Sequence, residues 1–242
     1  PLSVELCQFY HACGIKILEG YGLSETTAAI AVNRPGDFRF SSVGRPLAWT
    51  HFRIAEDGEI QVKGPAVFAG YHQDDQATEE AVTKDGWFCT GDIGEIDDRG
   101  FLRITDRKKE LIVTSGGKNI APQKLENRIK QIPLVSNALV YGDKQKYLIC
   151  LLTIDPAAAK RWAREKHLPE QMEALAEDPT LVSELEKEMK KINTELASYE
   201  TIKRFKVLPR DFSLEGGEVT PSLKLKRKVI TEKYRSQIDA LY

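Results

Sequence analysis

Hydrophobic and polar positions along residues 1–108 follow the short alternation that is typical of β-strands. Residues 51–54 and 59–63 are two such runs, and the Asp-Gly pair between them tolerates the positive φ of a tight turn. A second hairpin is predicted over residues 93–105, with its turn at an Asp-Asp-Arg-Gly sequence. This first part of the chain is therefore expected to be rich in strands.

Three shorter elements are predicted in the same part. Residues 2–6 have the apolar spacing of an amphipathic helix, and residues 15–18 (IKIL) predict a short strand that enters a Gly-Tyr-Gly turn. A short helix is expected over residues 74–82, because Asp74 or Asp75 can accept a hydrogen bond from its first turn as the N-cap.

Beyond residue 109 strands and helices interleave, which predicts a compact α+β domain. A strand over residues 110–113 leads into a loop over 114–119, and Pro122 starts a helix where its missing N–H costs nothing. The later predicted elements are strands over 138–141, 148–154 and 202–208, a Lys- and Glu-rich helical stretch over 156–200, and a final helix from about residue 226. The charges of this stretch predict a solvated surface over 156–192, with a partner site or a spacer as the alternatives.

The composition favours a folded protein of one large domain or two small ones. The chain has 242 residues, of which 41% are hydrophobic and 29% are charged, so a packed core is expected rather than global disorder. Its net charge of -1 argues against a nucleic-acid-binding protein, which usually carries a basic excess. No run is long and apolar enough to span a bilayer, and the first residues do not resemble a signal peptide.

The cysteines Cys7, Cys13, Cys89 and Cys150 have neither C-x-x-C spacing nor paired histidines, so no cysteine metal site is predicted. Free thiols indicate a reducing compartment, and we expect a cytoplasmic protein. The chain begins with Pro1 rather than Met, which suggests an internal piece of a longer protein.

Residues 19–27, with the sequence EGYGLSETT, are the first candidate for a binding site. The glycines on either side of Tyr21 let a flat ligand approach the backbone, where the ring can stack on a base. Ser24 offers a hydroxyl to a phosphate oxygen, and Glu25 offers an oxygen ligand to Mg²⁺. The alternative is a strand-to-helix turn that Ser24 or Thr26 caps.

Residues 85–92 (DGWFCTGD) and Arg107 form the second candidate. A carboxylate accepts hydrogen bonds from two neighbouring hydroxyls, and a guanidinium offers a rigid fork of donors, so Asp92 and Arg107 suit a ribose and its phosphate. The phosphate cradles G-x-x-x-x-G-K-[ST] and G-x-G-x-x-G are both missing from the chain. The alternative is an Asx-type turn at Asp92 and a surface charge at Arg107.

Two further stretches carry candidate chemistry. Residues 115–119 (SGGKN) contain Gly116 and Gly117, where another molecule can pass close to the backbone; the alternative is an ordinary flexible loop. Residues 220–228 (TPSLKLKRK) are strongly basic, and Lys224 is the cation that could meet a centre of developing negative charge. The alternative there is the solvated start of a helix.

Taken together, the order and spacing of these stretches resemble the adenylate-forming superfamily of acyl-CoA synthetases, luciferases and peptide-synthetase adenylation domains. The resemblance covers essentially the whole chain, and its characteristic string consists of Gly70, Tyr71, Thr78 and residues 85–94. Residues 193–205 and 220–227 are similar to the long-chain fatty acyl-CoA synthetases, as is the charged stretch over 156–192. Peptide-synthetase and short-chain members more often have Gly-Lys where this chain has Leu-Lys at 223–224.

The resemblance implies a two-domain α+β arrangement. Residues 1–108 would be the strand-rich end of a large N-terminal AMP-binding domain, whose Ser/Thr/Gly-rich phosphate loop is not in this chain. Residues 109–242 would be a small, mobile C-terminal lid domain, joined to the large domain by a hinge at Lys109.

The resemblance also implies roles for the nucleotide-binding candidates. Tyr21 would stack on adenine with Gly22 beside it, and Ser24 would contact phosphate. Asp92 would bind the ribose hydroxyls, and Arg107 would contact the ribose and a neighbouring phosphate.

Four other residues have implied roles around the reacting groups. Glu25 would help to hold Mg²⁺, and Gly116 and Gly117 would line the path of the coenzyme A arm. Lys224 would be the catalytic residue that bridges the carboxylate and the α-phosphate during adenylation.

The implied function is that of the C-terminal part of a long-chain fatty acid–CoA ligase, inactive or nearly so as an isolated fragment. Its partners would be ATP, Mg²⁺, a fatty acid and coenzyme A, with no nucleic acid and with peripheral membrane contact as a further expectation. The first alternative is a non-catalytic nucleotide-binding or protein-interaction module of the same fold. A peptide-synthetase adenylation domain or a luciferase-like monooxygenase is the second.

Overall fold

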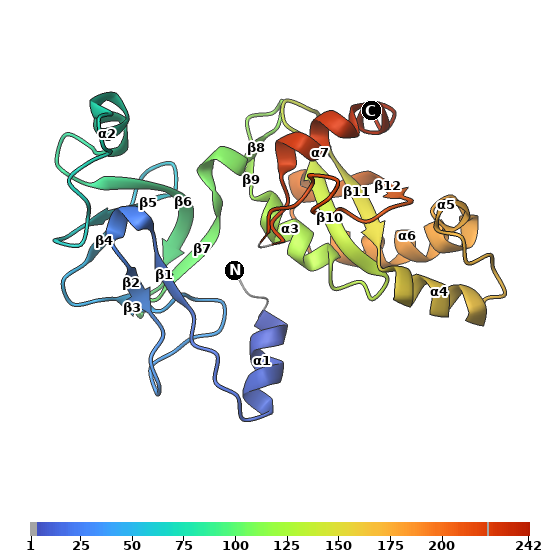
Figure 1. Cartoon of the computed structure of the whole chain (residues 1–242), viewed down its shortest axis with the longest axis horizontal. Helices are drawn as coiled ribbons and strands as arrows, with labels where there is room; N and C mark the ends of the chain where they lie inside the picture. Colours follow the sequence, from blue (N-terminus) through green and yellow to red (C-terminus); the bar gives the residue numbers. More distant parts are fainter. Residues whose placement is uncertain (1–3, 222) are drawn as a thin grey trace. The chain divides into compact units, whose positions relative to one another are not determined.

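The computed structural model describes residues 4–221 and 223–242, and the chain divides into two compact units, Pro1–Glu110 and Leu111–Tyr242 (Figure 1). Each unit has a hydrophobic core of its own. Residues 2–3 of the first predicted helix, and Ser222 of the basic stretch, lie outside the described residues.

The first unit contains two antiparallel sheets. The larger has the order β4–β5–β6–β7, with β4 (His51–Ile54), β5 (Glu59–Lys63), β6 (Phe88–Ile96) and β7 (Leu102–Arg107). The smaller is formed by β1 (Gly20–Gly22), β2 (Ala29–Val32) and β3 (Arg45–Pro46). Ile30 of the smaller sheet and Ile60 and Leu102 of the larger are buried in one cluster, so the two sheets share a core.

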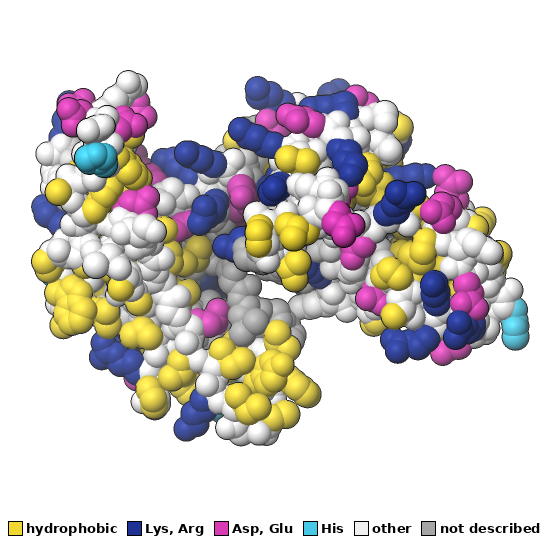
Figure 2. Space-filling view, viewed as in Figure 1, with side chains coloured by type: hydrophobic (Ala, Val, Ile, Leu, Met, Phe, Trp, Pro, Cys, Tyr) yellow, Lys and Arg dark blue, Asp and Glu magenta, His cyan; other side chains and the backbone are white. Residues whose placement is uncertain are grey.

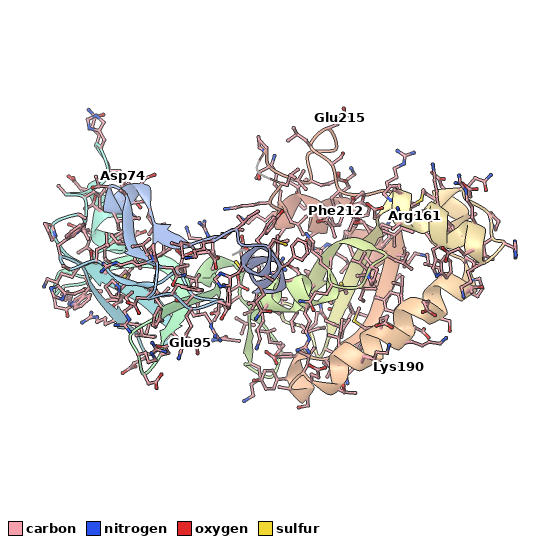
Figure 3. The ribbon with its side chains drawn as sticks, turned by 90° about the horizontal axis from the view of Figure 1, so that it is seen from below. Asp74, Glu95, Arg161, Lys190, Phe212 and Glu215 are labelled. Carbon is pink, nitrogen blue, oxygen red and sulfur yellow. The ribbon has the colours of Figure 1, made fainter. Side chains whose placement is uncertain are left out.

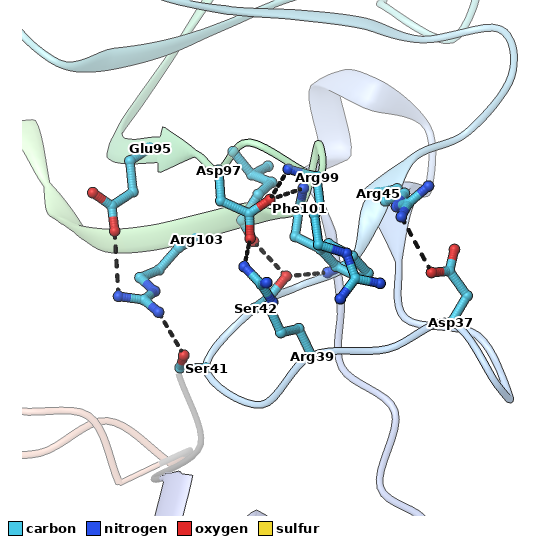
Figure 4. Close-up of polar contacts among 12 residues, drawn as sticks. Asp37, Arg39, Ser41, Ser42, Arg45, Glu95, Asp97, Arg99, Phe101 and Arg103 are labelled. Carbon is cyan, nitrogen blue, oxygen red and sulfur yellow. Dashed lines mark hydrogen bonds and ion pairs between the residues drawn. The ribbon is translucent and has the colours of Figure 1, made fainter.

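Both predicted hairpins are confirmed, as β4–β5 and β6–β7. In the turn between β6 and β7, Oδ1 of Asp97 accepts hydrogen bonds from the backbone N–H groups of Arg99 and Phe101 (Figure 4). This Asx arrangement satisfies two backbone donors that the turn leaves unpaired, which explains why an Asp-Asp-Arg-Gly sequence closes the hairpin.

The prediction of a strand over residues 15–18 is wrong, because the strand of this region is β1. Val32 at the end of β2 pairs with Gly20, and the chain beyond Asn33 turns back on itself through a bridge between Arg34 and Asp37. Among the described residues, 15–18 therefore have no partner strand, and an alternating sequence without a partner does not form a ladder.

The helical elements of the first unit are short: α1 (Val4–Ala12), α2 (Asp75–Ala81), and the 3₁₀ turns η1 (Ser24–Thr26) and η2 (Lys108–Glu110). The predicted cap of α2 is confirmed, because Oδ1 of Asp74 accepts a hydrogen bond from the backbone N–H of Ala77 at 3.0 Å.

The second unit is built around a three-stranded sheet of β10 (Val135–Tyr141), β11 (Leu148–Ile154) and β12 (Ile202–Leu208). β11 lies in the middle, antiparallel to β10 and parallel to β12. All of its residues are buried, with Leu148, Cys150 and Leu152 in one hydrophobic cluster and Ile149 and Leu151 in another. Its continuous apolar run is thus explained by a strand that is covered on both faces.

Helices pack on the two sides of this sheet. One of the two hydrophobic clusters contains buried residues of α3 (Pro122–Ile129), α4 (Pro156–Glu165), α5 (Met172–Leu175) and α6 (Pro179–Thr194), so these helices cover one side. The other cluster contains buried residues of α7 (Arg227–Lys233) and α8 (Arg235–Asp239), which cover the other side. A short pair, β8 (Ile112–Val113) and β9 (Asn119–Ile120), precedes α3, which begins at Pro122 as predicted. The predicted α+β class is confirmed.

The charged stretch over 156–200 is the crossover between the parallel strands β11 and β12, since such strands need a long connection. It consists of α4, α5, α6 and the turn η3 (Ser198–Glu200). Leu181, Leu185 and Met189 of α6 are buried in the core, whereas Lys190 points away from it (Figure 3). Lys, Arg, Asp and Glu are intermixed on the outer surface of this unit (Figure 2). The stretch is thus solvated on one face only.

None of the helices in the described parts of the chain has the length and apolar character that crossing a bilayer requires.

Candidate active site

The site in the first unit begins with an irregularity in β6. Gln61 of β5 pairs with Cys89, but Glu59, two residues earlier, pairs with Ile93, so three residues of β6 bulge out of the ladder. These residues are 90–92, and Gly91 has a φ of +71°, a conformation that glycine adopts without strain. Asp92 is the last residue of this bulge.

Asp92 is 5% exposed and makes contacts with both of its carboxylate oxygens. The hydroxyl of Tyr21 donates to Oδ2 at 2.6 Å, and Nε of Arg107 lies 3.4 Å from Oδ1. Asp92 and Arg107 are also direct cross-strand partners of β6 and β7. The two residues that were proposed from sequence to grip a ribose therefore lie side by side.

Tyr21 is 7% exposed, and burial, followed by its hydrogen bond to Asp92, raises the pKa of its phenol far above the usual range. The phenol therefore stays protonated and keeps donating to Asp92. Its side chain does not contribute to the lining of the cleft described next, so the stacking of this ring on a base stays a prediction.

A cleft of about 930 Å³ opens beside this pair, within the range of small-molecule sites. Its lining includes the candidates Gly22, Ser24, Glu25, Asp92, Arg107 and Lys109. Lys108 and Glu59 line it as well, and neither was singled out from the sequence. One cavity in the first unit thus brings together polar groups from separate segments of the chain that could meet a charged ligand.

Glu25 lies in the turn η1, and one of its oxygens is held by a neighbour: the hydroxyl of Tyr71 donates to Oε1 at 3.0 Å. Burial and then this bond raise the pKa of Tyr71. The N-cap of the turn is Leu23, and its backbone N–H donates to Oγ1 of Thr26, the last residue of the turn, at 2.9 Å. Ser24 is exposed in the cleft, so the capping alternative applies to Thr26 rather than to Ser24.

The described residues contain no group of three or more His, Cys, Asp or Glu side chains that could hold a metal by themselves. A single carboxylate such as Glu25 does fit Mg²⁺, because this ion usually keeps its waters and binds one or two carboxylates together with substrate phosphates.

The remaining candidates lie in the second unit, except Lys109, which is exposed in η2. Gly116 and Gly117 are exposed in the loop between β8 and β9, and Gly117 has a φ of +73°. Lys224 is exposed on a tight turn: its backbone N–H donates to Oγ1 of Thr220 at 3.1 Å, and its carbonyl accepts from the N–H of Thr220 at 2.8 Å.

Family models match both parts of the chain. Residues 109–242 match the AMP-binding enzyme C-terminal domain, and residues 1–72 match the AMP-binding enzyme family. The chain belongs to the AMP-binding enzyme family. The resemblance inferred from the four motifs is thereby confirmed.

Curated relatives are fatty-acid ligases. The chain is 46% identical over 244 residues to the Long-chain-fatty-acid–CoA ligase FadD15 of Mycobacterium tuberculosis, with 100% of the chain and 40% of the relative covered. It is 34% identical over 266 residues to the Long-chain-fatty-acid–CoA ligase ACSBG2 of Gallus gallus, with 100% and 35% covered. This AMP-binding family chain therefore spans about two fifths of the length of such relatives.

Solved structures have the same fold. o-Succinylbenzoate CoA synthetase (MenE) from Bacillus subtilis, in complex with ATP and magnesium ion, matches with a TM-score of 0.70 and 29% identity, over 94% of this chain and 44% of that one. The adenylation domain of a carboxylate reductase from Mycobacterium chelonae matches with a TM-score of 0.78 and 24% identity, over 100% and 37%.

Proposed function

We propose that the chain is the C-terminal part of a long-chain fatty acid–CoA ligase. Residues 1–108 would complete the large AMP-binding domain, and residues 109–242 would be the mobile lid, with Lys109 as the hinge between them. The ligases among its relatives support the substrate class. The observation that carries the proposal is the Asp92–Arg107 pair, held at the edge of a cleft of suitable size.

The first half-reaction joins two anions, a fatty carboxylate and ATP, to give acyl-AMP and pyrophosphate. Asp92 would accept hydrogen bonds from the ribose hydroxyls, and Arg107, with its side chain 62% exposed, would keep donors for the ribose and a phosphate. Tyr21 and Gly22 would face the adenine side of the nucleotide. Ser24 would donate to a phosphate oxygen.

Charge neutralisation would come from two further groups. Mg²⁺, when bound through Glu25 and the phosphates, supplies positive charge to the phosphate oxygens. Lys224 would bring an ammonium group to the α-phosphate and the attacking carboxylate, where negative charge develops. Its place on an exposed turn supports a contact that forms only in one domain arrangement.

In the second half-reaction the thiol of coenzyme A displaces AMP from the acyl-adenylate. Gly116 and Gly117 would let the coenzyme A arm pass close to the backbone, because neither has a side chain and both are exposed. The change between the two half-reactions would be absorbed at Lys109, as a few backbone dihedrals can absorb a domain rotation.

The test is ATP–pyrophosphate exchange by the full-length protein that carries this chain, with fatty acids of graded length. Exchange that depends on a long-chain acid, and that Asp92→Ala suppresses, is the expected result. No exchange with any carboxylate, together with intact AMP binding, would favour a non-catalytic nucleotide-binding module of the same fold. The isolated 242-residue chain is expected to show little or no exchange.

A further inference from the structure

Glu59 is a buried carboxylate that connects three segments of the first unit. It is 5% exposed at the start of β5. Its Oε1 accepts a hydrogen bond from the backbone N–H of Gly91 at 2.8 Å, and its Oε2 lies 2.8 Å from Nζ of Lys108. One side chain therefore holds both the bulge that presents Asp92 and the residue that follows Arg107.

The bulge makes the contact to Gly91 structurally important. Residues 90–92 are outside the regular β5–β6 ladder, so their backbone donors need other partners. Asp92 N–H donates to Oγ1 of Thr90 at 3.1 Å, and the hydroxyl of Thr90 donates to the carbonyl of Ile60 at 2.7 Å. Glu59 supplies the partner of Gly91, so the geometry of Asp92 depends on a side chain that does not touch it.

The contact to Lys108 fixes the other half of the site. Nζ of Lys108 also lies 2.6 Å from Oδ2 of Asp57, at the β4–β5 turn. These hydrogen bonds, to Asp57 first and to Glu59 second, raise the pKa of Lys108 well above its usual value. Lys108 stands between Arg107 and Lys109, so its two carboxylate partners fix the chain at the end of β7.

We infer that Glu59 is a positioning residue for nucleotide binding: it sets the separation of Asp92 and Arg107 and, through Lys108, fixes the chain immediately before the proposed hinge. This inference rests on the proposed function, because it assigns Glu59 a purpose only if Asp92 and Arg107 bind the nucleotide. Glu59 acts through its hydrogen bonds to Gly91 and Lys108.

The experiment compares Glu59→Gln, Lys108→Met and Asp92→Ala in the full-length protein. The amide of Glu59→Gln keeps an oxygen for Gly91 but loses the charge that holds Lys108. Because hydrogen bonds to charged groups are worth about 1.5–3 kcal/mol, each of the first two variants should raise the KM for ATP about tenfold or more. The KM for the fatty acid should change less than twofold.

A matched control is Glu95→Gln, on β6, the strand that also carries Asp92. Glu95 forms an ion pair with Arg103 at 3.3 Å (Figure 4). Its side chain is 62% exposed, so both KM values should stay unchanged. Lys108→Met keeps the inference testable if Glu59→Gln fails to fold, since the Lys108 side chain is 45% exposed. The double variant should resemble Lys108→Met, because both changes break the contact between Glu59 and Lys108 and Lys108→Met also removes the contact to Asp57.

The possible outcomes separate the inference from the proposed function. If Asp92→Ala raises the KM for ATP and neither Glu59→Gln nor Lys108→Met does, the positioning role is wrong and the proposed function stands. A lower kcat with both KM values unchanged would also overturn the positioning role. If Asp92→Ala leaves ATP binding intact, the proposed function itself is wrong and the role of Glu59 is lost with it.

Discussion

The candidate residues of the two units are held in opposite ways. In the first unit Asp92 is buried, and Tyr21, Arg107 and the bulge of β6 determine the direction of its carboxylate. In the second unit Lys224 is exposed on a turn that only backbone and hydroxyl hydrogen bonds to Thr220 define. A preorganised site suits a nucleotide that stays bound through both half-reactions, whereas an exposed lysine suits a contact that forms and breaks.

The largest expected effect tests the exposed side of this comparison. Lys224→Ala should slow acyl-adenylate formation about 10²–10³-fold, or roughly 3–4 kcal/mol, because it removes a cation from a centre of developing charge. Thioester formation from supplied acyl-adenylate should be nearly unaffected, and so should the unfolding midpoint. The two half-reactions are measured separately by pyrophosphate exchange and by single-turnover transfer to coenzyme A.

Lys228→Ala is the matched control for Lys224→Ala, since Lys228 is an exposed lysine of the same basic stretch, on α7. It should leave both half-reactions unchanged. An equal loss in the two half-reactions of Lys224→Ala would contradict the role assigned to Lys224.

A smaller effect is expected on the buried side, from Tyr21→Phe. The change removes the donor that lies 2.6 Å from Oδ2 of Asp92, and a hydrogen bond to a charged group contributes about 1.5–3 kcal/mol. We therefore expect AMP binding, measured by calorimetry, to weaken about tenfold or more, together with a lower unfolding midpoint.

Tyr71→Phe is the comparison variant for Tyr21→Phe, because Tyr71 donates to Glu25 instead. It should shift the Mg²⁺ concentration that half-maximal exchange requires and leave AMP affinity unchanged. If Tyr21→Phe binds AMP as well as the unmutated protein does, the phenol does not help to hold Asp92 for the nucleotide.

The smallest effect concerns the pH dependence of stability. Hydrogen bonds from Lys108, and then from the backbone N–H of Glu59, lower the pKa of Asp57. A carboxyl with a lowered folded pKa adds stability above its unfolded pKa, about 3.9, and this contribution is lost as the pH falls through the folded value.

Asp57→Asn should therefore reduce the free energy of unfolding slightly near neutral pH and flatten its decline below about pH 4. The Asp57 side chain is 48% exposed, so the difference should stay below about 1 kcal/mol. Urea unfolding between about pH 2.5 and about pH 7 measures this difference in the free energy of unfolding. A variant curve parallel to that of the unmutated protein would show that Asp57 does not titrate with Lys108 as its partner.

The sequence predicted that the ends of the β6–β7 hairpin lie near each other, because the hairpin over residues 93–105 places positions on either side of its turn opposite each other. The direct pairing of Asp92 with Arg107 was not predictable in this way, because it depends on a register shift between Ile93 and Gly94. The strand β11, with its continuous apolar run, and the cap at Asp74 were predictable from the sequence, because local chemistry decides them.

Other features depended on partners that are distant in the chain. Residues 15–18 have a strand-like sequence, yet β2 pairs with Gly20–Gly22 and leaves them without a ladder. The charged stretch over 156–192 was predicted as a solvated surface, yet α6 buries Leu181, Leu185 and Met189 because it covers the sheet between two parallel strands. Tyr71 belongs to the string that carries the family resemblance, yet its contact with Glu25, 46 positions away, was not predicted.

The sequence by itself determined the family, the α+β class, the hairpins and the residues that carry charge near the proposed nucleotide, since motifs and local turn chemistry encode them. Only the tertiary structure decided that Glu59, Lys108 and Tyr21 support those residues. The physical reason is that the packing of separate strands places a buried carboxylate or phenol. Glu59 meets Gly91 and Lys108, and Tyr21 meets Asp92, because of where the bulge of β6 lies and not because of any spacing along the chain.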